Sequence, residues 1–329
     1  MKLRHIEDSN EGILRKKKDD AFYYTYPSGK LVKDQNELER ISALGIPPIW
    51  ERVWICNESC GYLQATGYDA KGRKQYIYHP QYVEQQQQKK FDSLIDFAVA
   101  LPQLRKQAEK DLEQKRWTKE KVVALAILLL DEGYIRIGNK NYTRQNKTYG
   151  LTTLRKKHIH IDKKEIDFTY KAKSGKMRTV AIQNDQLVKL IRKCSELPGH
   201  RFLTYRQDGK SHPIDSQDVN SYIQEVTGGP FSSKYFRTWG ANVLVLDNLD
   251  TMQAKVAENQ RLNPETTLVR LVAKQLNNTV SVCRTYYIHP KVLKKALTNT
   301  FDWQRASTAS YGLDRTERTV LAMLDPEAL

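Results

Sequence analysis

The chain has 329 residues, and its 54 Lys and Arg against 38 Asp and Glu give a formal net charge of +16. Hydrophobic residues make up 40% and aromatic residues 9%, which is enough for packed cores and excludes a wholly disordered chain. The longest apolar run, residues 122–130, is much shorter than the ~20 residues of a membrane-spanning helix, so we expect no membrane partner. At roughly 150 residues per domain, the length indicates two domains.

The first 88 residues predict a small, β-rich domain of mixed α/β character. We expect strands at residues 21–26, 53–56, 62–65 and 74–78, turns at 27–30 and 67–72, and a helix at 36–44. Residues 85–90 are polar and rich in glutamine, which is typical of a bridge between domains. We therefore divide the chain into domains 1–88 and 89–329.

The second domain is predicted to be mainly helical. Apolar spacing indicates helices at residues 91–101, 104–115 and 118–132, with Thr118 as the N-cap and Gly133 as the end of the third. A β-rich insert follows over about 150–182, with strands at 158–161, 166–170 and 179–182 and a turn at 173–176. Residues 185–329 return to helices. The predicted fold class is α+β.

The positive charge is concentrated in one part of the sequence. Residues 1–88 hold 13 Lys and Arg against 12 Asp and Glu, whereas residues 134–178 hold 13 against 3, a local net charge of +10. A window that combines this charge with strands and aromatic residues favours a polyanionic partner, with nucleic acid ahead of an acidic membrane.

Cysteine and histidine patterns indicate neither a disulfide framework nor a metal site. Four cysteines in a chain of this length favour a reducing compartment. Cys56 and Cys60 have no second Cys/His pair nearby, and His158 and His160, which share a face of a predicted strand, have no third ligand. We predict no metal and no cofactor.

Four segments bring basic side chains and tyrosines into short contexts bounded by turns: residues 134–140, 170–176, 234–240 and 277–290. In these segments the sequence resembles the type IB DNA topoisomerases of the poxvirus and bacterial kind. The resemblance extends, in the expected order, to residues 46–50, 63–67, 71–79, 146–154, 197–199 and 218–220. It implies a β-rich N-terminal clamping domain, a catalytic domain of the tyrosine recombinase/topoisomerase IB fold, and double-stranded DNA as the partner.

The resemblance also implies a reaction. In that family a tyrosine attacks a DNA phosphodiester, forms a 3′-phosphotyrosyl bond and frees a 5′-hydroxyl, so that supercoils relax and the strand is resealed without ATP. Arginines suit the transition state because their planar, permanently charged fork donates two hydrogen bonds to the phosphoryl oxygens. The expelled 5′-oxygen needs a proton donor, which a lysine beside arginines can supply.

Five positions carry over as catalytic. Tyr287 matches the nucleophile, Arg136 and Arg237 the two arginines, and Lys173 the general acid on the hairpin. Asn278 lies nine residues before Tyr287, where poxvirus enzymes have a histidine; its amide can still donate a hydrogen bond. Val280 also departs from the family pattern, which usually has proline there.

Each of these assignments has an alternative. Tyr286 competes with Tyr287 for the role of nucleophile, and Lys171 and Lys176 compete with Lys173 for that of the acid. Strand alternation places residues 171 and 173 on one face, and the resemblance alone selects residue 173. Arg136 and Asn278, taken singly, fit a surface cation and a turn residue.

In the N-terminal domain, a strand matches one that contacts DNA in the family. The residues that we expect to contact DNA there are Arg73, Lys74, Gln75, Tyr76 and Tyr78. The competing interpretation is a half-buried strand face.

Two other functions were weighed. A tyrosine recombinase shares the fold and the chemistry, but such enzymes place histidine three residues before the second arginine, where this chain has Lys234. A non-catalytic basic DNA-binding protein would not need all five catalytic positions filled. We expect a monomer, because one nick and one tyrosine suffice, and a cytoplasmic location, with the nucleoid if the protein is bacterial or in the virion or host cytoplasm if it is viral.

Overall fold

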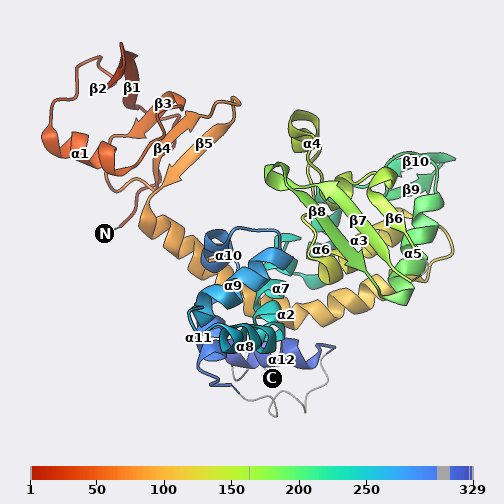
Figure 1. The fold of residues 1–329 in the computed structure, drawn as a ribbon. Coiled ribbons are helices and arrows are strands. Elements are labelled where there is room, and N and C mark those ends of the chain that lie inside the picture. The colour runs from red at the N-terminus through yellow and green to blue at the C-terminus, as the bar shows by residue number, and fades with distance from the viewer. Residues whose placement is uncertain (1, 163, 302–311, 326, 328–329) are drawn as a thin grey trace. The chain divides into compact units, whose positions relative to one another are not determined.

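The computed structural model describes residues 2–162, 164–301, 312–325 and 327, and the chain divides into two compact units, residues 1–90 and 91–329 (Figure 1). The sequence-based boundary lies two residues earlier. The first unit is built on an antiparallel sheet, and the second is mainly helical with small sheets. The predicted α+β fold class is confirmed.

The first unit holds a five-stranded antiparallel sheet in the order β2-β1-β3-β4-β5. The strands are β1 (Gly12–Lys18), β2 (Ala21–Thr25), β3 (Glu51–Cys56), β4 (Leu63–Tyr68) and β5 (Lys74–Tyr78). Helix α1 (Gln35–Ala43) is capped by Asp34, whose carboxylate accepts from the amides of Asn36 and Glu37. Its buried Ile41 packs with Ile13 and Ile55 of the sheet.

Strand β1 was not predicted from the sequence. Its residues Gly12 to Leu14 pair with β3, but from Arg15 onward it pairs with β2 alone. A two-stranded ribbon exposed on both faces needs no apolar alternation, so the run of basic residues gave no period-2 signal. The position of this strand follows from its partners.

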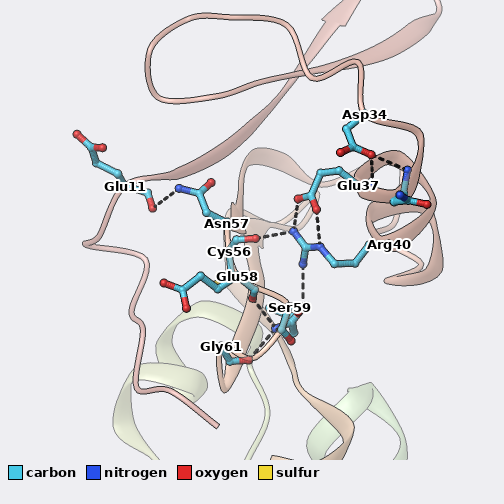
Figure 2. Close-up of polar contacts among 11 residues, drawn as sticks. Glu11, Asp34, Glu37, Arg40, Cys56, Asn57, Glu58, Ser59 and Gly61 are labelled. Atoms are coloured by element: carbon cyan, nitrogen blue, oxygen red, sulfur yellow. Dashed lines mark hydrogen bonds and ion pairs between the residues drawn. The ribbon is translucent and has the colours of Figure 1, made fainter. Parts of the chain in front are cut away.

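Arg40 ties α1 to the sheet of the first unit (Figure 2). Its guanidinium donates to both carboxylate oxygens of Glu37, to the carbonyl of Cys56 at 2.6 Å and to the side-chain oxygen of Gln64 at 3.0 Å. The amide of Gln64 in turn donates to the carbonyl of Gly61 at 2.7 Å. The turn between β3 and β4 is therefore held by side chains from the helix and from β4.

Helix α2 (Pro80–Leu112) replaces three predicted elements. The sequence predicted a bridge at 85–90 and two helices, 91–101 and 104–115, whereas the structure has one helix that passes through Pro102. Glutamine and lysine are good helix formers, so a polar run rich in both continues a helix as readily as it forms a linker. The predicted break between the two helices is therefore wrong. Residues 85–90 are helical, and the division into two units falls at the end of this stretch, after Lys90.

In the second unit, helix α3 (Lys119–Gly133) lies at the centre. It is buried from Lys121 to Ile127 and at Leu129 and Leu130, and it packs against helices and strands of the same unit. Thr118 caps it as predicted, accepting from the amide of Lys121.

The other helices are α4 (Lys140–Asn146), α5 (Asp185–Glu196), α6 (Ser216–Thr227), α7 (Lys234–Asp247), α8 (Leu249–Glu258), α9 (Pro264–Gln275), α10 (Val280–Tyr286), α11 (Pro290–Leu297) and α12 (Arg315–Leu324). Among the described residues, none of the helices is long and apolar enough to cross a membrane.

The predicted β-rich insert is present as an antiparallel sheet of β6 (Ile159–Ile161), β7 (Ile166–Lys171) and β8 (Met177–Ile182). A second hairpin, β9 (Thr204–Gln207) and β10 (Lys210–Pro213), lies in a stretch that was predicted to be helical. Asp208 and Gly209 connect it, and both have positive φ angles, 49° and 73°. Asp-Gly is a strong hairpin signal that the sequence analysis did not use.

A buried ionic cluster ties α12 to the core of the second unit. Arg105 of α2 donates to Asp131 at 2.6 Å and to Glu317 of α12 at 2.7 Å. Glu317, whose residue is 4% exposed, also accepts from the indole nitrogen of Trp239 at 3.1 Å. The C-terminal helix is therefore held through a carboxylate that cannot be removed without leaving buried donors unpaired.

We expect Glu317→Ala to lower the free energy of unfolding by about 2–4 kcal/mol, because it leaves the buried indole nitrogen of Trp239 unpaired and removes one of the two carboxylates that accept from Arg105. Glu265→Ala is the matched control: Glu265 pairs with Arg284, but both side chains are more than 40% exposed, so the loss should be at most about 1 kcal/mol. Urea unfolding of both variants, followed by circular dichroism, measures the difference. Equal losses would contradict the assigned role of the cluster.

Candidate active site

The site begins where the central helix α3 ends. Tyr134 follows the helix in the left-handed conformation, with φ 47°, and its amide donates to the carbonyl of Leu130. The sequence placed the end of the helix at Gly133, but Gly133 is still helical. A Cβ at Gly133 would lie 3.1 Å from a methyl carbon of Val180. Close packing therefore explains the glycine, and the turn itself is made by Tyr134.

Arg136 lies two residues beyond this turn on a well-supported segment. The amide of Leu151 donates to the carbonyl of Arg136 at 2.8 Å, and a Cβ at Gly150 would lie 2.5 Å from that same carbonyl oxygen. The guanidinium Nη2 of Arg136 donates to the side-chain oxygen of Asn278 and, at 3.3 Å, to the carbonyl of Asn277. The structure thus brings Arg136 and Asn278 into direct contact.

Arg237 lies on α7 and is 3% exposed. It donates to the carbonyl of Tyr134, to the carbonyl of Leu276 at 2.8 Å and to the side-chain oxygen of Asn278 at 3.3 Å. Burial lowers the pKa of Arg237, and so does the charge of Arg136, whereas Tyr287 has the opposite effect. The two predicted arginines therefore share the oxygen of one asparagine.

Tyr287 directly follows α10 and lies beside Arg237. The guanidinium carbon of Arg237 is 5.4 Å from the centre of the Tyr287 ring. Tyr287 packs against the core, whereas Tyr286 is 45% exposed. Of the two adjacent tyrosines, the structure places Tyr287 beside Arg237, which in turn contacts Asn278.

Lys173 is the one predicted catalytic residue that is not brought into this cluster. It lies in a single 3₁₀ turn, Lys173–Gly175, between β7 and β8, and it is exposed. Strand alternation does not reach residue 173, because β7 ends at Lys171. The argument that residues 171 and 173 share a strand face is therefore wrong.

The five residues proposed to contact DNA in the first unit divide between two environments. Arg73 donates through two guanidinium nitrogens, Nε and Nη2, to Oδ2 of Asp69, whose pKa it lowers to about 2, and Gln75 donates to that same oxygen at 3.0 Å. Lys74 pairs with Asp8 at 2.5 Å. Tyr76 and Tyr78 are 48% and 39% exposed, and their stacked rings have centroids 6.0 Å apart. The tyrosines thus form an exposed aromatic surface, while the polar residues have partners within the unit.

The sequence analysis missed Arg178 on β8. This arginine is 6% exposed and donates to the carbonyls of Tyr134 and Gly133, both at 3.0 Å, and of Gln275 at 3.4 Å. Burial lowers its pKa. Residues 178, 180 and 182 form the buried face of β8. An arginine that alternates with Val180 and Ile182 on this face could therefore have been predicted from the sequence to point into the core.

Asn242 on α7 was also missed. Its side-chain amide donates to the carbonyls of Thr238 and Tyr287, at 2.7 and 3.1 Å, and its oxygen accepts from the amide of His289 at 2.8 Å. This fully buried residue fixes the backbone on both sides of Ile288. No sequence pattern distinguishes it from other helical asparagines.

Three nitrogen donors in the cluster are buried and have no hydrogen-bond partner in the part of the chain that the structure describes: Arg237 Nε, Asn277 Nδ2 and Asn278 Nδ2. Buried donors are nearly always paired in folded proteins, so a group of them beside two arginines marks a site for an anion. A phosphate beside a tyrosine hydroxyl would be placed for transfer to that hydroxyl.

The structure shows no candidate metal centre: within the described residues, no three His, Cys, Asp or Glu side chains cluster as metal ligands would. All four cysteines are free, and three of them are buried. His158, predicted to lie on a strand, is buried in a 3₁₀ turn instead.

Comparison with known proteins gives consistent matches. Residues 72–310 match the family model of the catalytic core of eukaryotic DNA topoisomerase I, and residues 21–69 match that of the N-terminal domain of bacterial DNA topoisomerase IB. The chain is 34% identical to the DNA topoisomerase 1B of Acanthamoeba polyphaga mimivirus over 286 residues, which cover 84% of this chain and 85% of the relative. It is 23% identical to the DNA topoisomerase 1B of vaccinia virus (strain Copenhagen) over 290 residues, which cover 82% and 88%.

We expect Asn242→Ala to lower the free energy of unfolding by roughly 2–4 kcal/mol, because it leaves the carbonyl of Tyr287 and the amide of His289 buried without partners. Asn259→Ala is the control, since exposed Asn259 accepts a single bond from the amide of Arg261, and its loss should stay below about 1 kcal/mol. Thermal unfolding measures both. A value for Asn242→Ala as small as that of the control would contradict its role in holding the segment.

Proposed function

The chain belongs to the type IB DNA topoisomerase family, and we propose that it nicks one strand of duplex DNA through a 3′-phosphotyrosyl bond to Tyr287, allows supercoils to relax and reseals the strand without ATP. The observation that carries this proposal is the contact of buried Arg237 with Asn278 and with the ring of Tyr287. This contact supports the proposal because it joins the tyrosine ring to an arginine that carries an unpaired donor.

The reaction exchanges one phosphoester for another. The phenolic oxygen of Tyr287 attacks the phosphorus, the bond from phosphorus to the 5′-oxygen breaks, the phenol loses its proton and the 5′-oxygen gains one. Resealing is the reverse reaction, with the 5′-hydroxyl as the nucleophile. Because the number and type of bonds are unchanged, no ATP is needed.

Arg136, Arg237 and Asn278 are suited to hold the phosphoryl oxygens. Negative charge grows on these oxygens in the transition state, and donors that are already in place stabilise it without reorganisation. Arg237 is held by two backbone carbonyls, and Arg136 by the carbonyl of Asn277 and the side chain of Asn278. Two of the three unpaired donors of the cluster, Arg237 Nε and Asn278 Nδ2, belong to these residues and are suited to face the phosphate.

Lys173 fits the role of general acid because its turn leaves the residue exposed, where a substrate could meet its ammonium group. Ser174 and Gly175 have φ angles of 69° and 78°, which make the turn tight and project the lysine from the end of β7 and β8. We propose that DNA binding brings this ammonium group to the 5′-oxygen, since it lies outside the cluster formed by the other four residues.

DNA contact in the first unit is assigned to the exposed pair Tyr76 and Tyr78 and to their neighbours Arg73, Lys74 and Gln75. Arg73 and Lys74 are paired with Asp69 and Asp8, so phosphate contact would exchange a carboxylate for a phosphate. One tyrosine makes one nick, so we propose that the protein acts as a monomer.

We expect the wild-type protein to relax supercoiled plasmid in the presence of EDTA and without ATP. Tyr287→Phe should abolish relaxation and the covalent protein–DNA adduct while leaving non-covalent binding nearly intact, because the phenolic oxygen forms the ester. Tyr286→Phe is the matched control and should retain both activities. An adduct formed by Tyr287→Phe but not by Tyr286→Phe would reverse the assignment.

We expect Lys173→Ala to slow cleavage of ordinary DNA by roughly 10²–10⁴-fold, as for the loss of a general acid. A substrate with sulfur in place of the bridging 5′-oxygen should restore cleavage, because a thiolate leaves without a proton. Lys171→Ala and Lys176→Ala are the controls, and neither should show rescue that depends on sulfur. Rescue of one of these variants in place of Lys173→Ala would transfer the role to that lysine.

A further inference from the structure

Asn277 occupies the residue position that ends α9. Its φ is 50°, its amide donates to the carbonyl of Lys274 at 3.1 Å, and the next amide, of Asn278, donates to the carbonyl of Ala273 at 2.9 Å. This is the usual way to end a helix, and glycine or asparagine fills the left-handed position. The backbone alone would be satisfied by glycine.

The side chain of Asn277 is not explained by this capping role. Its amide nitrogen is buried and has no hydrogen-bond partner among the residues that the structure describes. A buried, unpaired donor lowers stability, so an asparagine used for its backbone conformation alone would be expected to turn its amide to solvent.

The surroundings of Asn277 indicate an acceptor. Nη2 of Arg136 donates both to the carbonyl of Asn277 and to the side-chain oxygen of Asn278, and Arg237 donates to the same side-chain oxygen. Asn278 Nδ2 and Arg237 Nε are the other two unpaired buried donors of the cluster. The group that would satisfy all three donors, next to two guanidinium groups, is an anion with several oxygens.

We propose that the side-chain amide of Asn277 donates a hydrogen bond to a non-bridging oxygen of the scissile DNA phosphate, as a second amide donor beside Asn278. This inference rests on the proposed function, because it takes the phosphate at this cluster to be the one that Tyr287 attacks. The phosphate would then accept from the neutral side-chain amides of two adjacent residues, Asn277 at the end of α9 and Asn278 immediately after it.

The test uses substitutions that keep the backbone conformation. Asn277→Gly retains the left-handed turn and removes the donor, and Asn277→Asp keeps the size but replaces the donor with a negatively charged acceptor. Asn299→Gly is the matched control, because Asn299 also has a positive φ, 52°, but is exposed at the end of α11. Single-turnover cleavage of a duplex by the full chain is measured, together with thermal unfolding.

We expect Asn277→Gly to slow cleavage roughly 10–10²-fold, at or below the lower limit of the range for removal of one preorganised donor, because Asn278 supplies a second amide donor. Asn277→Asp should slow it further, and Asn299→Gly should change it less than about twofold. Unfolding temperatures of both glycine variants should stay at or above that of the wild type, because glycine adopts this φ without strain. Cleavage by Asn277→Gly at the wild-type rate would reduce Asn277 to a helix cap and overturn the inference.

A methylphosphonate at the scissile position identifies the acceptor. Replacing a non-bridging oxygen by methyl removes the acceptor, so the stereoisomer that lacks the relevant oxygen should slow the wild type more than it slows Asn277→Gly. Equal slowing of the two proteins by both stereoisomers would place the bond elsewhere and overturn the assignment. Failure of the wild type to form any adduct with Tyr287 would instead overturn the proposed function.

Discussion

The arrangement of the site depends on the hydrogen bonds that the carbonyl oxygen of Tyr134 accepts. This oxygen lies at the end of the buried helix α3 and accepts hydrogen bonds from two buried arginines, Arg178 of β8 and Arg237 of α7. Tyr134 can present this oxygen because its backbone adopts the left-handed conformation. Its ring packs directly against Gly240: a Cβ at that position would lie only 2.1 Å from a carbon of the ring. The central helix, the small sheet and α7 therefore meet at a single atom.

Helix termini explain how two arginines, Arg178 and Arg237, can be buried close together. The carbonyls that receive Arg178 and Arg237 belong to residues 133 and 134, at the end of α3, and to residues 275 and 276, at the end of α9. The C-terminal end of a helix carries partial negative charge and unpaired carbonyls, so two such ends offset part of the cost of burying the cations. The positive charge that remains uncompensated is available to an anionic substrate. This is the same preorganisation that stabilises charge in a transition state, because the donors are fixed before the substrate arrives.

Prediction from the sequence succeeded where the signal is local. The cap at Thr118, the strands of the small sheet and the hairpin turn at 173–176 each follow from a few adjacent residues. Prediction failed where the secondary structure depends on contacts with residues distant in the sequence, or where one sequence pattern is compatible with two structures. A glutamine-rich run serves equally as a linker or as part of α2, and the basic strand β1 is defined by pairing with β2 rather than by its own pattern.

The family, the fold class and the candidates Arg136, Lys173, Arg237, Asn278 and Tyr287 could all be predicted from the amino-acid sequence, because motif residues and their spacing are properties of the chain. The tertiary structure decided which of two adjacent tyrosines lies beside Arg237, and it added Arg178, Asn242 and the amide of Asn277. These residues are defined by the carbonyls and unpaired donors around them, which come from segments far apart in the sequence, as in the contact between Arg136 and Asn278, 142 residues apart. Burial and hydrogen-bond satisfaction are properties of the assembled core, so the partners of these residues could not be read from a local pattern, even where alternation on β8 marks Arg178 as facing inward.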